Sequence, residues 1–190
     1  MIRIATRASA LARWQAHHVA AALSAGGAGE VELVLVETLP DRRLDLPLAT
    51  LGGKGLFVKE VQAAVLDGRA DLAVHSAKDL PARTPDELVL AAVPERADPR
   101  DVLVGSTLAG LPPGARIATG SARRRVQLAW ERPDLTFTGL RGNIATRLTR
   151  LDEGIADAIV MAAAAIERLE LDLGDRPHEV LAEDRMVPQV

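Results

Sequence analysis

The sequence predicts an α/β protein in which two small domains follow one another along the chain. Apolar runs of strand length alternate with segments of helical periodicity in both halves of the 190 residues, an order typical of α/β sheets. A charged segment with two prolines, residues 94–100, separates the halves and has the composition of a hinge. We therefore assign residues 1–94 to a first domain, 95–100 to a hinge and 101–184 to a second domain.

Each domain is predicted to contain four strands and two or three helices. In the first domain we expect strands at 1–5, 31–36, 72–74 and 88–93, and helices at 10–23 and 56–66. In the second we expect strands at 101–104, 115–118, 135–138 and 156–161, and helices at 121–131, 144–152 and 162–169. We expect mainly parallel pairing in both sheets, and no packed element in the polar segment 172–190.

Composition excludes several classes of function. The net charge of −3 and the 2% of aromatic residues argue against a general nucleic-acid binder. The sequence has no cysteine, which excludes disulfides, thiolate metal sites and cysteine nucleophiles within these residues, and its four histidines lack metal-ligand spacing. No apolar run reaches membrane-spanning length and no signal peptide is recognisable, so we expect a cytoplasmic protein without metal, membrane or nucleic-acid partner.

Residues 71–81, DLAVHSAKDLP, combine a short apolar strand with polar groups at its carboxyl end. His75, Ser76, Lys78 and Asp79 follow that strand directly, and in open α/β sheets this is the edge where ligands bind. An ordinary solvated exit from a strand explains Ser, Lys and Asp equally well. As a lone acid among bases, Asp79 is expected to stay ionised, and it could stabilise a cation or carry a proton.

Arginines are concentrated in residues 115–150, where eight arginines face two acids. This window carries +6, so the remainder must carry −9 to give −3, which indicates an anion site in an acidic protein. Arg123 and Arg124 stand at one predicted helix start, and Arg141 and Arg147 at the next. Helix-start amides and guanidinium groups both favour carboxylates or phosphates.

The first domain supplies further cations near predicted turns. Arg7 and Ser9 lie at a strand-to-helix turn, where Ser9 can also serve as a helix cap. Lys54 lies in a glycine-rich turn that lacks the spacing of a nucleotide-binding loop, so a simple tight turn explains it as well. Together with the arginines, these residues predict a cleft between the domains that binds a ligand with several carboxylates.

Seven motifs resemble the porphobilinogen deaminase, or hydroxymethylbilane synthase, family. They cover nearly the whole chain, at residues 3–9 (RIATR with Ser9), 14–16 (WQA), 52–60 (GGKGLFVKE), 71–81 (DLAVHSAKDLP), 95–101 (ER with DPRD), 123–128 (RR with QL) and 140–148 (LRGN with TRL). The resemblance implies a transferase of porphyrin and heme biosynthesis. This family condenses porphobilinogen units into the linear tetrapyrrole hydroxymethylbilane with loss of ammonia, on a covalently held dipyrromethane primer.

The resemblance also implies a fold and a set of site residues. It implies two domains like type II periplasmic binding proteins, with a ligand cleft between them and residues 185–190 as the start of a second hinge. Asp79 matches the catalytic aspartate. The matched cofactor-binding positions are Ser76, Lys78, Asp79, Arg123, Arg124 and Lys54, and the matched substrate-binding positions are Arg7, Ser9, Arg141 and Arg147.

The sequence also departs from the family pattern. The family attaches its primer through a cysteine in a third domain; we expect that domain to be absent, and the primer cannot be attached through cysteine in these residues. Thr50 replaces a usual substrate-binding lysine, and Leu39-Pro40 replaces a usual Arg-Gly. The alternative reading is a truncated or repurposed non-catalytic relative that binds a pyrrole or another polycarboxylate. The sequence leaves the oligomeric state open.

Overall fold

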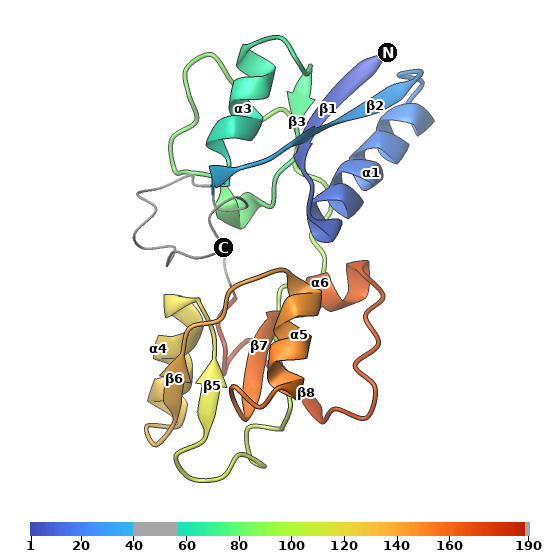
Figure 1. The fold of residues 1–190 in the computed structure, drawn as a ribbon. Helices are drawn as coiled ribbons and strands as arrows, with labels where there is room; N and C mark the ends of the chain where they lie inside the picture. The colour runs from blue at the N-terminus through green and yellow to red at the C-terminus, as the bar shows by residue number, and fades with distance from the viewer. Residues whose placement is uncertain (40–56, 189–190) are drawn as a thin grey trace. The chain divides into compact units, whose positions relative to one another are not determined.

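The computed structural model describes residues 1–39 and 57–188, and the chain divides into two compact units (Figure 1). The first unit spans Met1–Glu95 and the second Arg96–Val190. The limits of the hinge at residues 95–100 remain a prediction.

The first unit is built on a three-stranded parallel sheet with the order β2-β1-β3. Its strands are β1 (Ile2–Arg7), β2 (Val31–Val36) and β3 (Leu72–Ala73), and its helices are α1 (Ala10–Ala25), α3 (Lys59–Leu66) and the short 3-10 helix η2 (Ala77–Asp79). The parallel pairing predicted for this domain is confirmed. Ile4 and Ala5 of β1 are fully buried, as are Val61 and Ala64 of α3, so the core is aliphatic.

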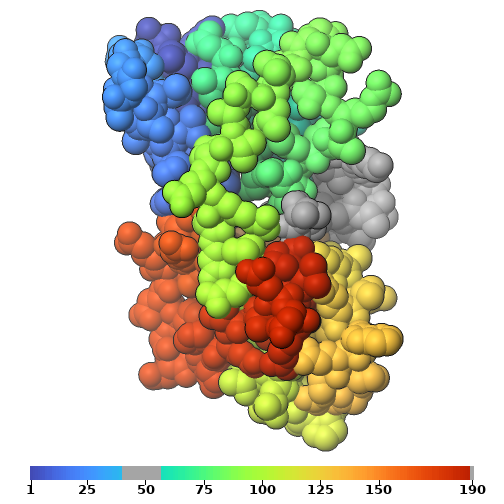
Figure 2. All heavy atoms as spheres, turned by 180° about the vertical axis from the view of Figure 1, so that it is seen from behind, coloured from blue at the N-terminus to red at the C-terminus, as the bar shows by residue number. Residues whose placement is uncertain are grey.

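The strand predicted at 88–93 is not present. No ladder in the described part of the chain includes these residues, and Val89, Leu90 and Val93 are 82%, 60% and 72% exposed. In Figure 2 the yellow-green stretch that contains them lies at the surface. An apolar run can predict a strand locally, but a strand also needs a hydrogen-bonding partner.

The second unit is built on a five-stranded mixed sheet with the order β6-β5-β7-β4-β8. Its strands are β4 (Asp101–Val104), β5 (Arg116–Ala118), β6 (Thr136–Thr138), β7 (Ala158–Ala162) and β8 (His178–Leu181). The parallel pairing we expected holds for β5 with β6 and β7, but β4 is antiparallel to both β7 and β8. The expectation of no packed element in residues 172–190 is wrong, because β8 lies there and pairs with β4; His178 and Glu179 interrupt its apolar pattern.

Helices cover both faces of this sheet. They are α4 (Ala122–Glu131), α5 (Ile144–Asp152) and α6 (Ala163–Arg168). Leu128 of α4 packs in one apolar cluster with Ile117, whereas Leu148 of α5 packs in another with Ala118. Because neighbouring residues of a strand point to opposite faces, α4 and α5 cover opposite sides of the sheet.

Candidate active site

The parallel strands of the first unit bring several predicted site residues to one edge. β1 ends at Arg7 and its neighbour β3 ends at Ala73, so the loops that follow both strands begin at the carboxyl edge of the sheet. One loop carries Ser9 and the other carries His75 through Asp79. The charge of Arg7 acts electrostatically on both His75 and Asp79, which places these groups in one electrostatic neighbourhood.

Asp79 is a largely buried carboxyl group. It lies in η2, where its backbone N–H donates to the Ser76 carbonyl oxygen at 2.9 Å. Burial raises the pKa of Asp79, and the opposing charges of Lys78 and Arg7 are the smaller effects. The shift is opposite in direction to the sequence expectation, because desolvation of the carboxylate outweighs the two cations.

Other groups at this edge have defined partners. The Ser76 hydroxyl donates to Oε1 of Gln15 on α1 at 3.0 Å, and the Ser9 hydroxyl accepts the Ala12 N–H at 3.4 Å as the N-cap of α1. The Arg7 guanidinium carbon lies 4.4 Å from the Phe57 ring centroid, a cation–π contact. Lys78 also has an interaction partner within the protein. Lys54 lies outside the described residues, as does Thr50.

His75 follows β3 at the start of this loop, and one nitrogen of its imidazole has no hydrogen-bond partner among the described residues. That nitrogen is Nε2, and it is buried. Burial lowers the pKa of His75, and the charge of Arg7 lowers it further. A neutral imidazole with a free ring nitrogen can hydrogen-bond a ligand at this edge.

The second unit places two helix N-termini at one sheet edge. β5 leads to α4 and its parallel neighbour β6 leads to α5, so both helices start at the carboxyl ends of adjacent strands. Ser121 caps α4 by accepting the Arg124 N–H at 3.4 Å, and Asn143 caps α5 by accepting the Thr146 N–H at 2.9 Å. Free amides at two helix starts favour a bound anion.

Arg147 is a partly buried cation in α5. Its Nε donates to the Gly142 carbonyl oxygen at 3.0 Å, and within the described residues no carboxylate pairs with it. Burial lowers the pKa of Arg147, and the charge of Arg124 lowers it further. A buried guanidinium beside another guanidinium is stabilised by a bound anion. Arg141 stands half-buried in the loop between β6 and α5 and makes an interaction of its own.

Arg123 and Arg124, the two predicted cofactor-binding arginines, share one carboxylate that we did not predict. Asp101, the first residue of β4, forms ion pairs with both, and the Arg124 pair measures 2.7 Å from Nη2 to Oδ1. Asp101 is 2% exposed. One sequence feature indicates this role: Asp101 is an acid at the start of a four-residue strand whose other residues are apolar.

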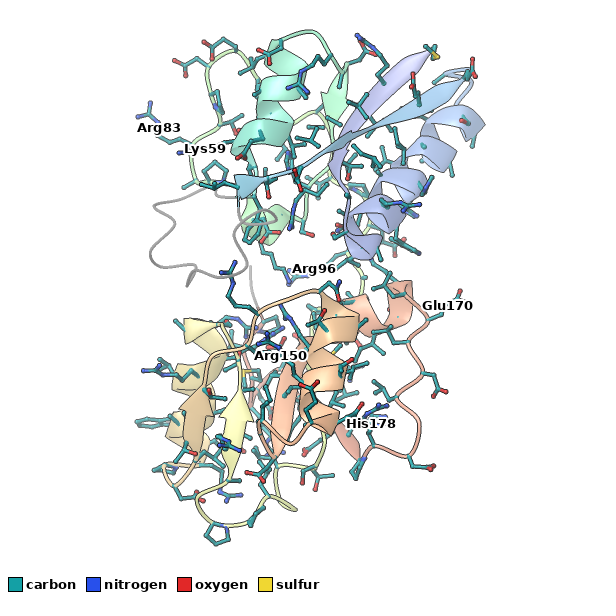
Figure 3. All side chains as sticks on the ribbon, in the orientation of Figure 1. Lys59, Arg83, Arg96, Arg150, Glu170 and His178 are labelled. Carbon is teal, nitrogen blue, oxygen red and sulfur yellow. The ribbon has the colours of Figure 1, made fainter. Side chains whose placement is uncertain are left out.

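Other features lie apart from these residues. A pocket of about 400 Å³ in the first unit is lined by Lys59 of α3 and by Arg83 and its neighbours, but by none of the predicted site residues (Figure 3). Residues 1–39 and 57–188 contain no group of three potential metal ligands. Nor does that part of the chain contain a helix long and apolar enough to cross a membrane.

The two edges differ in their chemistry. The edge of the first unit presents a protonatable carboxyl and an unused imidazole nitrogen, and the edge of the second presents helix-start amides and surplus guanidinium charge. The surplus charge of the second unit's edge fits a ligand with carboxylates, and the orphaned Nε2 of His75 at the first unit's edge fits a ligand with N–H groups.

Comparisons with known proteins agree with this chemistry. Residues 2–190 match the family model "Porphobilinogen deaminase, dipyromethane cofactor binding domain". Two porphobilinogen deaminases of Nitratidesulfovibrio vulgaris, from strains DP4 and Hildenborough, are each 50% identical over 192 aligned residues. Each match covers 98% of this chain but 60% of the relative, so the chain spans 60% of the length of these curated relatives.

A solved structure supports the fold alone. The periplasmic domain of B. pertussis BvgS matches with a TM-score of 0.50 and 14% identity, over 94% of this chain and 34% of that one. The predicted α/β class, with a likeness to periplasmic binding proteins, is therefore confirmed. The cleft between the units remains a prediction. The match over residues 2–190 and the relatives at 50% identity show that the chain belongs to the porphobilinogen deaminase family, within its dipyrromethane cofactor binding domain.

Proposed function

We propose that this chain binds porphobilinogen and oligopyrroles and takes part in their condensation to hydroxymethylbilane with release of ammonia. The observation that carries the proposal is Asp79, a largely buried carboxyl group whose pKa burial raises in the company of Arg7 and Lys78. Such a group suits proton transfer to a ligand that cations hold by its carboxylates. The family match supplies the reaction class.

The cations of both units suit the substrate. Porphobilinogen carries one acetate and one propionate group, so every added unit brings two negative charges. We assign the carboxylates to Arg7, Arg141 and Arg147 with the hydroxyl of Ser9, because guanidinium groups match carboxylates in geometry and charge. Arg147 contributes most, since it is partly buried without a carboxylate partner among the described residues.

Asp79 would move the proton that the reaction requires. The bond between the aminomethyl carbon and nitrogen breaks, and the nitrogen leaves as ammonia after it gains a proton. A carbon–carbon bond then forms to the next pyrrole ring, and that ring carbon loses its proton. The Asp79 carboxyl can give the first proton, stabilise the positive charge on the pyrrole as a carboxylate, and take back the second.

The family's dipyrromethane would be held by Ser76, Lys78, Asp79, Arg123 and Arg124, together with Lys54 outside the described residues. When bound, it supplies the pyrrole carbon to which the first substrate unit is joined. The excess of arginine over carboxylate at the second unit's edge fits a group with several carboxylates.

Asp79→Asn tests the proposal because asparagine keeps the size of the side chain but cannot release a proton. We expect ammonia release from porphobilinogen to fall by at least about a hundredfold, whereas the affinity for porphobilinogen in calorimetry changes by less than about threefold. Asp67→Asn, an exposed acid that follows α3, is the control and should retain the wild-type rate. Wild-type ammonia release by Asp79→Asn would remove Asp79 from the reaction.

Binding without catalysis is the second candidate, since these residues contain no cysteine for primer attachment. Intact mass spectrometry after incubation with porphobilinogen separates the two. A covalent adduct together with ammonia release supports the transferase. Saturable binding with neither adduct nor ammonia supports the binding protein.

A further inference from the structure

Asp101 is a buried carboxylate at one end of the second unit's sheet. It opens β4, an interior strand of the sheet, and pairs in register with Ala162 of β7 and Leu181 of β8. Only 2% of the residue is exposed. A carboxylate taken this far out of water must be compensated by charge and hydrogen bonds.

Two arginines from the first turn of α4 supply that compensation. Arg124 donates to Oδ1 through Nε at 3.1 Å and through Nη2 at 2.7 Å, and its Nη1 donates to the Val160 carbonyl oxygen at 2.9 Å. Arg123 donates to Oδ2 through Nη2 and to the Val187 carbonyl oxygen through Nη1. Asp101 therefore fixes both guanidinium groups at the start of the helix that borders the anion site.

One acid does not neutralise this cluster. Arg123, Arg124 and Arg147 carry three positive charges against the single charge of Asp101, and Arg124 acts electrostatically on Arg147. The remaining positive charge is available to a ligand. Asp101 competes with that ligand for Arg123 and Arg124, because each guanidinium has a limited number of donors.

We propose that Asp101 is a positioning residue that acts as the internal counter-ion of the anion site, setting both the place and the residual charge of its arginines. The inference rests on the proposed anion-binding function. It predicts that loss of this acid increases, and does not reduce, the stabilising effect of an added anion. Removal of this carboxylate leaves buried Arg124 uncompensated, so an added anion should stabilise the variant more than it stabilises the wild type.

The experiment measures the thermal unfolding midpoint against the concentration of inorganic pyrophosphate. Asp101→Asn should have a lower midpoint without anion, and pyrophosphate should stabilise it with a half-saturating concentration about tenfold below that of the wild type. Asp134→Asn removes the same charge from an exposed pair with Arg132 and should respond as the wild type does. A residue that only supports the fold would lower the midpoint without increasing the response to pyrophosphate.

A double variant separates charge from packing. Asp101→Asn/Arg124→Gln removes both buried charges, and its response to pyrophosphate should return to within about threefold of the wild type. If Asp101→Asn is unfolded without anion, pyrophosphate should refold it, as measured by far-ultraviolet circular dichroism. A single variant that pyrophosphate neither refolds nor stabilises more than wild type overturns the inference, as does a double variant that responds like the single one.

These outcomes are independent of the proposed catalytic function. Ammonia release and porphobilinogen binding by the wild type decide that function. An enhanced pyrophosphate response in Asp101→Asn supports the role of Asp101 even where the wild type releases no ammonia. A wild type that condenses porphobilinogen while Asp101→Asn shows no enhanced response rejects only the role of Asp101.

Discussion

At the scale of single residues, Arg147 serves ligand binding at the expense of stability. Its guanidinium is partly buried, donates a hydrogen bond of 3.0 Å from Nε to the Gly142 carbonyl oxygen, and has the like charge of Arg124 nearby. A buried charge without an opposite partner destabilises the protein until a counter-ion binds. Replacement by an apolar side chain of similar length should therefore stabilise the fold and weaken ligand binding.

Arg147→Met should leave the free energy of unfolding equal to that of the wild type or raise it by about 1 kcal/mol. The same substitution should weaken porphobilinogen binding at least about tenfold, because one partly buried cation is lost. Urea denaturation and calorimetry measure the two effects. Arg150→Met, on the exposed side of the same helix (Figure 3), is the control. It should change neither the free energy of unfolding nor the affinity for porphobilinogen by much. A destabilised Arg147→Met that binds normally would contradict this assignment.

The residue scale also shows the limit of sequence reasoning. Arg123, Arg124 and Arg147 could be selected from their position at predicted helix starts, because capping and helix spacing are local. Asp101, the common partner of Arg123 and Arg124, lies 22 residues before Arg123 and on a different element. Only the sheet brings the two together. In the same way, the burial that raises the pKa of Asp79 depends on tertiary packing and not on its charged neighbours in sequence.

At the scale of elements, the turn before α5 depends on Gly142. Its φ is +101°, and an added Cβ would lie 2.8 Å from Cγ2 of Thr146, the residue whose N–H Asn143 caps. Gly154, after α5, also has a positive φ (+73°) but has open space around it. Gly154→Ala should cost about 1 kcal/mol of stability through φ alone.

Gly142→Ala should cost about 1 kcal/mol more than Gly154→Ala and should also weaken anion binding, because the steric clash displaces the start of α5. Urea denaturation and pyrophosphate titration of both variants measure this difference. Equal stability and equal pyrophosphate affinity in the two variants would show that the turn does not shape the site.

A second prediction at this scale concerns the ion pair that joins β1 to the start of β3. Asp71 accepts the Arg3 backbone N–H at 2.8 Å and Arg3 Nη2 at 2.7 Å, and these bonds lower the pKa of Asp71 to about 2. In the unfolded chain its pKa is near 3.9. The ion pair thus stabilises the fold above about pH 4, and this contribution disappears as the pH falls towards 2.

Asp71→Asn should accordingly have a lower unfolding midpoint than the wild type at pH 6, and the difference should shrink as the pH approaches 2. Thermal unfolding across this range, with Asp67→Asn as the exposed control, measures it. A difference that stays constant with pH would mean that Asp71 stabilises the fold by some means other than its charge.

The elements themselves were predictable where their signals are local. The helix at 144–152 and the strand at 31–36 have the predicted bounds, since the first has a capping residue and the second a clean apolar pattern. The helix predicted at 56–66 is observed at Lys59–Leu66, and residue 56 lies outside the described residues. The strand predicted at 88–93 was wrong and β8 was missed, because strand formation depends on partners far away in sequence.

At the scale of the whole molecule, charge is distributed unevenly along the chain. The window 115–150 carries +6 and the rest carries −9. The structure neutralises part of this surplus locally, for example in the Arg132–Asp134 pair. It leaves the buried cluster around Arg124 and Arg147 with more positive than negative charge. Such surplus charge predicts that ligand binding weakens as the salt concentration rises.

The account as a whole states that these cations bind the carboxylates of porphobilinogen. Calorimetric titration of porphobilinogen into the 190-residue chain, beside Arg147→Met, tests it most directly. We expect saturable binding by the wild type that weakens with salt and falls at least about tenfold in the variant. A folded wild type that shows no saturable binding, or an Arg147→Met variant that binds equally well, would contradict the account.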